Sequence, residues 1–267
     1  MFKIILWSLL LISLISPNLS QVNIVVDAKK SSRQRIDKRK IIKRKIIKRN
    51  SVKKISKKSP KSVELAVPFS KQDYSLSCEV ASLQMALAYR GINVSEDDLL
   101  AKIPKTLPYA KEFQSDGAFV WGDPDIGFVG DVNGKWKSKE QGLVGGTGWG
   151  VNYKPIANLT DSFRKDSYGK RGGSTQEIKN ELEAGNPVII WMQSDKTVKE
   201  EIFYKTQSGK TVKFIQDHVV LITGYKTSKQ HGFVYTVKDP FFGETTWSEA
   251  RLNRYWARYN NDMVVVK

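Results

Sequence analysis

The chain changes from a loop into a helix within Lys71-Gln-Asp-Tyr-Ser-Leu-Ser-Cys-Glu-Val-Ala-Ser-Leu-Gln-Met-Ala-Leu-Ala-Tyr-Arg90. This stretch contains Cys78, the only cysteine among the 267 residues. From Val80 onward the apolar residues recur with the period of a buried helix, which we expect to end near Gly91. Cys78 therefore lies where the loop becomes the helix.

The start of this helix sets the chemistry expected of Cys78. Ser75 and Ser77 are suited to cap it. Because the positive end of the helix dipole favours the thiolate, we expect the thiol pKa to be lowered and the sulfur to be reactive. Gln72 lies in the preceding loop, from which its amide N–H can reach the same place. The alternative for Cys78 is a small buried hydrophobe, a common state of a lone cysteine on an apolar helix.

The cysteine and histidine content excludes several kinds of site. A single cysteine forms no intrachain disulfide, no four-cysteine zinc site and no Cys-x-x-Cys redox motif. The two histidines, His218 and His231, are not part of a His-Glu-x-x-His motif. Gly209-Lys-Thr211 resembles the end of a phosphate loop, but Tyr204 stands where that loop requires glycine. We expect neither a metal nor a cofactor.

Residues 1–20 read as a targeting segment. A basic start, an apolar run over residues 4–15 and a region of small residues predict a signal peptide. The run is shorter than the roughly 20 residues of an ordinary membrane span, and the alternative is an uncleaved short anchor. Positive charge soon after the run, from Lys29 onward, favours retention on the cytoplasmic side. We nevertheless expect export, with the protein secreted or associated with the cell envelope.

Residues 21–62 form a predicted basic, disordered linker. Residues 28–61 hold 17 Lys or Arg and one acid, so they carry +16 of the net charge of +17, and residues 62–267 carry +1. Specific nucleic-acid binding favours a basic face on a folded domain, so we do not expect it here. Isoleucine pairs recur in the linker and suit contact with an anionic membrane or cell-wall surface through residues 29–61; the alternative is a plain linker.

Residues 63–267 have the composition of a globular domain, in which helices come first and an antiparallel sheet later, so we predict an α+β fold. The patterns predict helices over residues 78–91, 95–104, 155–166, 174–184 and 248–256. They predict strands over residues 65–69, 187–192, 218–225, 232–239 and 262–267, and a hairpin over residues 197–215. Residues 104–155 are rich in Gly, Pro, Asp and Trp and have little periodicity, which is typical of a functional or mobile segment.

A cysteine nucleophile needs a nearby base, and the base needs a group that orients it. His218 opens an apolar strand, and Asp239 ends the next strand of the predicted hairpin. The start of one strand lies beside the end of the other in such a hairpin, so His218 and Asp239 are expected to be neighbours. The alternatives are a structural histidine with a satisfied hydrogen bond and a turn carboxylate before proline. His231, in a polar turn, is a weaker candidate for the base.

Several motifs follow one another in a recognisable order. They are Val67-Pro68 leading to Gln72, Ser77-Cys78-Glu79-Val80-Ala81-Ser82, Trp121-Gly-Asp-Pro124, Gly127-Phe-Val-Gly130, Gly148-Trp-Gly150, Gly185-Asn-Pro-Val188, His218-Val-Val-Leu-Ile-Thr-Gly-Tyr225 and Asp239-Pro240. With this order, residues 66–256 resemble the C39-like peptidases, a branch of the papain-like cysteine peptidases. The resemblance implies a papain-like fold, with the nucleophile helix packed on a C-terminal antiparallel sheet. Ser77 departs from the family pattern, which often has glycine before the cysteine.

The resemblance also implies roles for four residues. Cys78 is the expected nucleophile, His218 the base and Asp239 the orienting group, while Gln72 and the Cys78 backbone N–H form the oxyanion hole. Residues 117–153 are expected to wall the cleft. Relatives that cut double-glycine leader peptides are often fused to an ATP-driven exporter, and no membrane bundle or phosphate loop is recognised here. We therefore expect an exported cysteine hydrolase that cleaves peptide or amide bonds; the alternative is a non-catalytic papain-like binding module tethered to an anionic surface by the basic linker.

Overall fold

The computed structural model describes residues 62–134, 146–193, 202–214, 217–230 and 232–267. The predicted signal peptide, nearly all of the predicted linker and His231 lie outside these residues. The described residues belong to one compact unit, Ser59–Lys267. No helix within them is long and apolar enough to cross a membrane.

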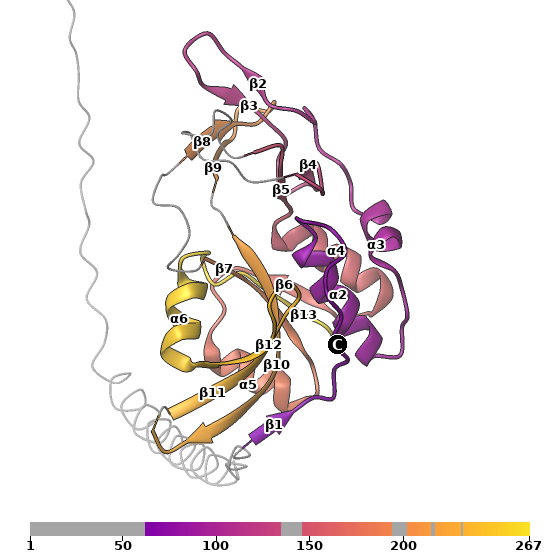
Figure 1. The fold of residues 1–267 in the computed structure, drawn as a ribbon, viewed down its shortest axis with the longest axis vertical. Helices are drawn as coiled ribbons and strands as arrows, with labels where there is room; N and C mark the ends of the chain where they lie inside the picture. The colour runs from indigo at the N-terminus through magenta and orange to yellow at the C-terminus, as the bar shows by residue number, and fades with distance from the viewer. Residues whose placement is uncertain (1–61, 135–145, 194–201, 215–216, 231) are drawn as a thin grey trace, which may run out of the picture. The chain divides into compact units, whose positions relative to one another are not determined.

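One antiparallel sheet forms the centre of this unit (Figure 1). Its strands run in the order β12-β11-β10-β7-β13-β6, and β1 pairs with the far half of the long strand β10. The strands are β1 (Ser62–Glu64), β6 (Tyr168–Lys170), β7 (Val188–Met192), β10 (His218–Ser228), β11 (Gly232–Asp239), β12 (Gly243–Ser248) and β13 (Met263–Val265). β10 and β11 pair as the predicted hairpin, and β12, a strand that the sequence pattern did not predict, pairs with β11.

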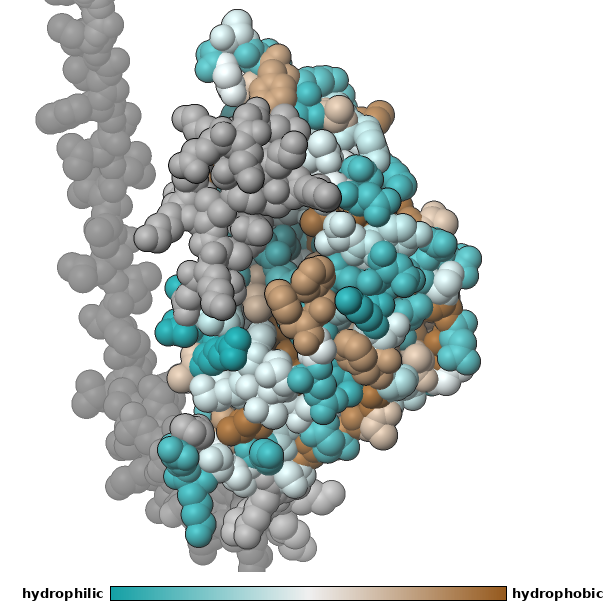
Figure 2. Space-filling model, viewed as in Figure 1, coloured by the Kyte–Doolittle hydropathy of each residue, from teal (hydrophilic) through white to brown (hydrophobic). Residues whose placement is uncertain are grey.

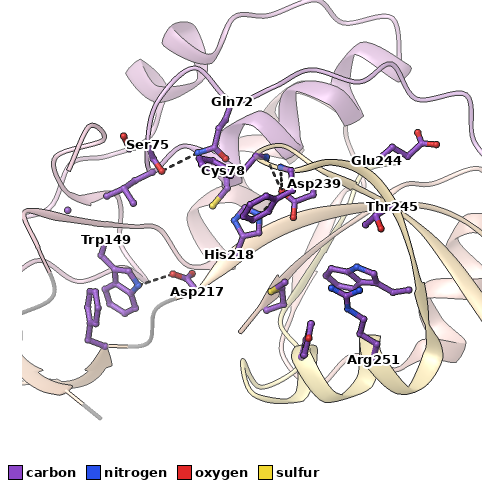
Figure 3. A pocket seen from close by; sticks show the side chains of 18 residues that line it. Gln72, Ser75, Cys78, Trp149, Asp217, His218, Asp239, Glu244, Thr245 and Arg251 are labelled. Atoms are coloured by element: carbon purple, nitrogen blue, oxygen red, sulfur yellow. Dashed lines mark hydrogen bonds and ion pairs between the residues drawn. The ribbon is translucent and has the colours of Figure 1, made fainter. Parts of the chain in front are cut away.

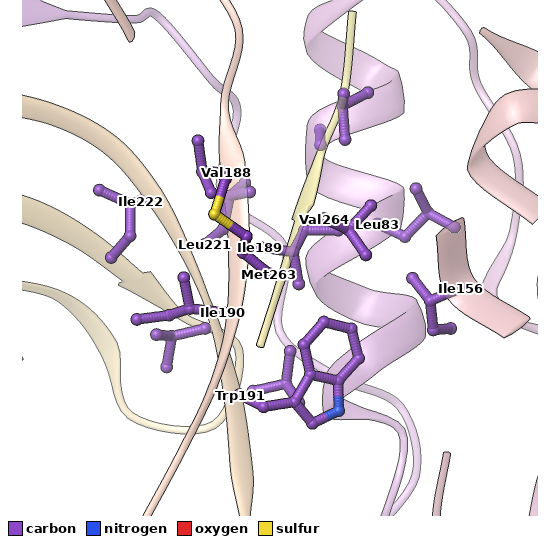
Figure 4. Packing of buried hydrophobic residues seen from close by; sticks show 14 of the residues in the cluster. Leu83, Ile156, Val188, Ile189, Ile190, Trp191, Leu221, Ile222, Met263 and Val264 are labelled. Carbon is purple, nitrogen blue, oxygen red and sulfur yellow. The ribbon is translucent and has the colours of Figure 1, made fainter. Parts of the chain in front are cut away.

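The helices cover the sheet and complete the hydrophobic core. They are α2 (Cys78–Tyr89), α3 (Glu96–Lys102), α4 (Tyr153–Phe163), α5 (Thr175–Glu183) and α6 (Glu249–Ala257). Figure 1 shows α2 and α4 on one side of the sheet and α6 on the other. Every residue of β7 is buried, which is typical of a strand covered on both faces. In the core, Leu83 of α2 and Ile156 of α4 lie near the side chains of β7 and β13 (Figure 4).

Local sequence signals explain several helix starts. Ser174 and Glu177 form the predicted capping box of α5, in which each side chain accepts the backbone N–H of the other residue. The side chains of Ser95 and Ser248 accept backbone N–H groups at the starts of α3 and α6. α4 begins at Tyr153, earlier than predicted, and has Pro155 in its first turn. Proline is tolerated there because the N–H groups of the first turn have no acceptor within the helix.

Two local predictions are wrong. The strand expected over residues 65–69 lies earlier, at β1. Leu65 still donates its N–H to Thr223 at 2.9 Å, but the Val67 N–H turns back to the Leu65 carbonyl at 2.7 Å and the chain leaves the sheet. The side chain of Ser77 does not cap α2, because its hydroxyl is bound to the backbone of Tyr74.

The stretch over residues 104–155 carries short strands that the sequence pattern did not reveal. β2 (Glu112–Phe113) and β3 (Phe119–Val120) form a sheet with β8 (Ile202–Lys205) and β9 (Thr211–Phe214), in which β3 and β8 are parallel. β4 (Val129–Gly130) pairs with β5 (Gly148–Gly150). The buried side chains of this region form a second core cluster: Phe119, Trp121, Val129, Trp149, Tyr204, Val212 and Phe214. Aromatic packing therefore orders a segment whose composition resembles a loop.

The surface of the domain carries hydrophobic groups interspersed among polar ones on the face shown in Figure 2. Two exposed aromatic residues, Phe241 and Phe242, come after Pro240, the residue that follows β11. Their rings contact each other at a centroid distance of 4.8 Å, and Phe242 also lies edge-on to His218 at 6.1 Å. The end of β11 thus combines a buried carboxylate with an apolar rim.

Candidate active site

One pocket of about 710 Å³ brings together all four residues singled out from the sequence. Gln72 and Cys78 come from the N-terminal part of the domain, whereas His218 and Asp239 come from β10 and β11. Figure 3 shows the Cys78 thiol and the His218 ring side by side within the pocket. This proximity arises because α2 packs on β10, the strand that begins at His218.

Cys78 is the first residue of α2 and is half-buried. Its sulfur lies 3.4 Å from Oε2 of Glu79, to which the thiol donates a hydrogen bond. The backbone N–H of Val219, the residue after His218, favours the charged form of the sulfur. The thiol therefore has an acceptor on its own helix and a favourable backbone dipole on β10.

The electrostatics of the pocket oppose the expected lowering of the thiol pKa. Burial raises the pKa of Cys78 well above its ordinary value, and the charges of Glu79 and Asp217 raise it further. The Val219 N–H lowers it, but by less. The sequence-based expectation of a lowered pKa is wrong for this arrangement, because it considered the helix dipole but neither the burial of the thiol nor the two carboxyl groups.

His218 and Asp239 are neighbours, as the hairpin geometry predicts. β10 and β11 pair with Leu221 opposite Lys238, which brings the start of one strand to the end of the other. His218 Nε2 lies 2.7 Å from Asp239 Oδ1. This contact leaves Nδ1 of the imidazole ring free of Asp239 and available on the ring's other side.

The turn after β11 fixes the Asp239 carboxylate. Its Oδ1 also accepts the backbone N–H groups of Phe241 and Phe242, at 2.9 and 3.0 Å. Burial works against the charge on Asp239, but the hydrogen bond and charge of His218, helped by the two N–H groups, hold its pKa below the usual value. Asp239 is therefore set up to remain ionised beside the ring.

Gln72 lines the pocket, but its amide N–H groups are already engaged. Nε2 donates to the carbonyl oxygens of Tyr74 at 2.7 Å and Ser75 at 3.1 Å. Oε1 is buried and has no hydrogen-bond partner among the described residues. The Gln72 backbone N–H donates to the Pro240 carbonyl at 3.0 Å, which ties this loop to the turn that holds Asp239. To donate to an oxyanion, the side chain must release one of its two backbone acceptors.

Two carboxyl groups beside Cys78, the buried Glu79 and the half-buried Asp217, were not singled out from the sequence. Glu79 is 2% exposed and accepts the Val151 N–H at 2.8 Å, and Asp217 accepts the indole N–H of Trp149 at 3.1 Å. Burial raises the pKa of Glu79 to about 7 and, together with the charge of Glu79, raises that of Asp217 to about 8. Glu79 follows Cys78 in the sequence, and Asp217 precedes His218. Each acid also adjoins an apolar segment, and this is the sequence signal by which both could have been found.

The Gly148-Trp149-Gly150 strand walls the pocket, within the region predicted to do so. Two of its glycines are required by close approach. A Cβ on Gly148 would lie 2.0 Å from the Asp131 carbonyl oxygen, and one on Gly150 would lie 2.3 Å from Glu79 Oε1. Gly150 also has a φ of +133°, which side chains rarely adopt. The wall thus reaches Glu79 only because these positions lack side chains.

No group of three or more His, Cys, Asp or Glu among the described residues is arranged to hold a metal ion. In and beside the pocket the side chains offer a thiol, an imidazole–carboxylate pair, a primary amide and two carboxyl groups whose pKa values are raised to about 7 and about 8.

Comparison with known proteins gives consistent matches. The model of the Peptidase_C39 like family matches residues 64–264. The uncharacterized protein YvpB of Bacillus subtilis (strain 168) is 28% identical over 193 residues, which are 71% of this chain and 68% of that protein. A crystal structure of a candidate C39-like peptidase from Bacillus anthracis superposes with a TM-score of 0.59 at 24% identity, covering 78% of this chain and 98% of that chain. This structural likeness confirms the predicted α+β, papain-like fold.

Proposed function

Since the chain belongs to the C39-like peptidase family, we propose that it is a cysteine hydrolase that cleaves peptide or amide bonds in the pocket around Cys78. Family and fold support a peptidase in general terms. The observation that carries the specific proposal is the convergence of Cys78, the His218–Asp239 pair and Gln72 on one pocket.

In the proposed reaction, His218 takes the proton of the Cys78 thiol and the sulfur attacks the substrate carbonyl carbon. The position of Asp239 suits it to hold the ring through Nε2, so that Nδ1 exchanges the proton with the thiol. An ionised Asp239 also stabilises the imidazolium that forms. The lowered pKa of the Asp239 carboxyl supports this role, because the group stays charged throughout.

The negative charge that develops on the carbonyl oxygen needs donors. The Cys78 backbone N–H is one, because the first N–H groups of a helix have no partner within the helix. Gln72 is the proposed second donor. Of its two internal bonds, the 3.1 Å bond to Ser75 is longer and more exposed than the 2.7 Å bond to Tyr74, so Ser75 is the acceptor that it releases. Such a donor is typically worth about 2.7–4 kcal/mol in the transition state.

The remaining steps return the enzyme to its starting state. His218 gives its proton to the leaving amine as the C–N bond breaks, and a thioester joins the acyl group to Cys78. Water then attacks the thioester carbonyl and passes a proton to His218. The C–S bond breaks, which releases a carboxylic acid and restores the Cys78 thiolate beside the protonated His218. The proposed substrate is a peptide or another amide. We further propose that the protein acts outside the cytoplasm, with residues 1–20 as export signal and residues 29–61 as a tether to an anionic surface.

Degradation of a defined peptide mixture tests the proposal. The full domain is incubated with the mixture, and new peptide termini are identified by mass spectrometry, with Cys78→Ala and His218→Ala as matched variants. We expect termini that appear with the wild type and are absent with both variants. Identical peptide maps for the wild type and Cys78→Ala would contradict the hydrolase.

A specific observation also supports the second candidate, a binding module on the same fold. The Cys78 thiol pKa is raised, and both donors of Gln72 are satisfied within the protein. A module of this kind would bind the same peptide with equal affinity whether residue 78 is Cys or Ala and would not convert it. Titration of the wild type and Cys78→Ala with one peptide, followed by analysis of that peptide for cleavage, separates the two functions.

A further inference from the structure

The pocket extends beyond the His218–Asp239 pair to a group of side chains that the proposed reaction does not use. Trp247 lies near the end of β12, and Arg251 and Tyr255 lie one turn apart on α6. Residues four apart on a helix share a face, so Arg251 and Tyr255 both project toward Trp247. Figure 3 shows Arg251 on the opposite side of the pocket from Gln72 and Ser75.

Two aromatic rings hold the Arg251 guanidinium in place. Its central carbon lies 5.0 Å from the ring centroid of Trp247 and 5.3 Å from that of Tyr255. The two rings are nearly perpendicular, at 81°, and their centroids are 5.8 Å apart, so the guanidinium occupies the corner between them. Stacking of this kind orients the flat cation while its N–H donors remain free to bind an anion.

Arg251 has no ionic partner within the described part of the chain. It is the only Lys or Arg among the described residues that line the pocket, and no described carboxylate lies within ion-pair distance of it. Glu244, an acid on the same side, is paired with Lys238. The indole N–H of Trp247 is buried and also lacks an acceptor among the described residues. A cation and a hydrogen-bond donor thus lie together, and neither has an acceptor in the part of the chain that the structure describes.

The two ends of the pocket differ in charge. Two carboxyl groups with raised pKa values, Glu79 and Asp217, lie beside the thiol, whereas Arg251, a permanent cation, lies at the other end. An anionic group of a ligand is therefore favoured near Arg251. A planar guanidinium matches a carboxylate with two parallel hydrogen bonds, which makes a carboxylate the fitting anion.

We propose that Trp247, Arg251 and Tyr255 form a subsite for a carboxylate of the substrate, so that the enzyme selects peptides carrying an acidic residue or a free chain terminus near the bond presented to Cys78. This inference rests on the proposed function, because it assigns the substrate class of the same pocket. Arg251 binds the carboxylate, and the two aromatic rings position the guanidinium.

Affinity labels for Cys78 test the subsite without requiring turnover. The labels are N-bromoacetyl-(Gly)n-Glu-amide and N-bromoacetyl-(Gly)n-Gln-amide, with n from one to three, and N-bromoacetyl-(Gly)n-Gln with a free terminal carboxylate. Each reacts when the Cys78 sulfur displaces bromide and forms a C–S bond. The readout is the ratio of second-order labelling rates, acidic label over neutral label, for one protein at low salt.

Arg251→Gln is the test variant and Arg254→Gln the matched control. Arg254 lies on the same helix and stacks on the same Tyr255 ring at 5.3 Å, but it does not line the pocket. We expect an acidic-to-neutral ratio severalfold above one for the wild type at one linker length, near one for Arg251→Gln and unchanged for Arg254→Gln. A preference for the Glu label identifies a side-chain carboxylate, and a preference for the free-acid label identifies a chain terminus.

A ratio near one at every linker length in the wild type would overturn the subsite. A preference that persists in Arg251→Gln would overturn it as well. Failure of the proposed function has a different signature: the labelling rates of all three labels would be the same in wild type and His218→Ala, whatever their ratio.

Discussion

Replacing Glu79 by glutamine is the most direct test of how the pocket controls its thiol. Glu79 Oε2 accepts a hydrogen bond from the Cys78 thiol, and Oε1 accepts one from the Val151 N–H at 2.8 Å. Glutamine has the same shape and keeps an oxygen for Val151. It places an N–H₂ group where Oε2 had been, so a repelling charge is removed and a donor to the thiolate is added. Both changes lower the Cys78 pKa.

The size of the effect follows from the contact distance and from the titration of Glu79. The sulfur and Oε2 are 3.4 Å apart, and two unit charges at about 4 Å interact by about 4 kcal/mol at an effective dielectric constant of about 20. Because the pKa of Glu79 is about 7, the carboxyl can take up a proton at little cost at neutral pH and so avoid the repulsion. At pH 9 that protonation costs about 2.7 kcal/mol, which is the most that the repulsion can contribute there, or roughly 100-fold in thiolate fraction. A less basic thiolate is also a weaker nucleophile, so the expected gain in alkylation rate at pH 9 is roughly tenfold.

The assay is the rate of iodoacetamide alkylation of Cys78 between pH 5 and 10, by mass spectrometry, in wild type and Glu79→Gln. Glu96→Gln is the matched control. Glu96 is also buried, at 1% exposure, and accepts the Asp73 N–H, but it makes no hydrogen bond to Cys78. We expect the midpoint of the pH–rate curve to shift to lower pH in Glu79→Gln only. An unchanged or slower reaction in a folded Glu79→Gln protein would refute the electrostatic reasoning.

Three further predictions concern stability and the pocket wall. Burial raises the pKa of Glu79 to about 7 and that of Asp217 to about 8, so the folded state retains protons that the unfolded chain releases near pH 4. The free energy of unfolding, measured by urea denaturation, should therefore fall by a few kcal/mol as pH rises from about 5 to about 8. It should vary less with pH in Asp217→Asn, and an equally steep fall in that variant would contradict a raised pKa of Asp217. Trp191→Ala should lower the unfolding free energy by about 3–5 kcal/mol, because the ring is fully buried and its N–H donates to the Val151 carbonyl at 2.9 Å. A loss of unfolding free energy below about 1 kcal/mol, measured by calorimetry, would be inconsistent with this packing. Gly148→Ala should displace the wall, since its Cβ would lie 2.0 Å from a backbone oxygen, and should lower thermal stability; an unshifted melting temperature would argue against the close approach.

The parts of the fold that sequence patterns predict are those determined by local rules. Helical periodicity places the start of α2 at Cys78, and the capping box places the start of α5 after Ser174. The proximity of His218 and Asp239 follows from antiparallel pairing alone, because two adjacent strands joined by a short turn have little choice of register. The catalytic roles of these residues stay predictions, since proximity does not establish chemistry.

The parts that sequence patterns miss depend on contacts between distant segments. Glu79 meets Val151 only after the Gly148–Gly150 strand has folded against α2, and nothing local to either residue signals this contact. The direction of the Gln72 amide depends on the path of the loop over residues 72–75. The expected strand over residues 65–69 fails for a related reason, because the backbone turns at Val67 and leaves the sheet.

The Gly148–Gly150 strand couples the stability of the domain to the reactivity of its thiol. Val151, which follows the strand, donates its N–H to Glu79 and accepts the indole N–H of Trp191 through its carbonyl. One backbone unit thus connects the buried core of β7 with the carboxyl group that raises the Cys78 pKa. A change that loosens this connection exposes Glu79 to water. Exposure lowers the pKa of the Glu79 carboxyl and so increases its negative charge at neutral pH. At the same time the solvent screens this charge from the sulfur. Trp191→Phe keeps the ring packing but removes the N–H donor to Val151. We therefore expect it to alter the pH dependence of Cys78 alkylation as well as stability. Substitution of a core residue remote from Val151 should alter stability alone.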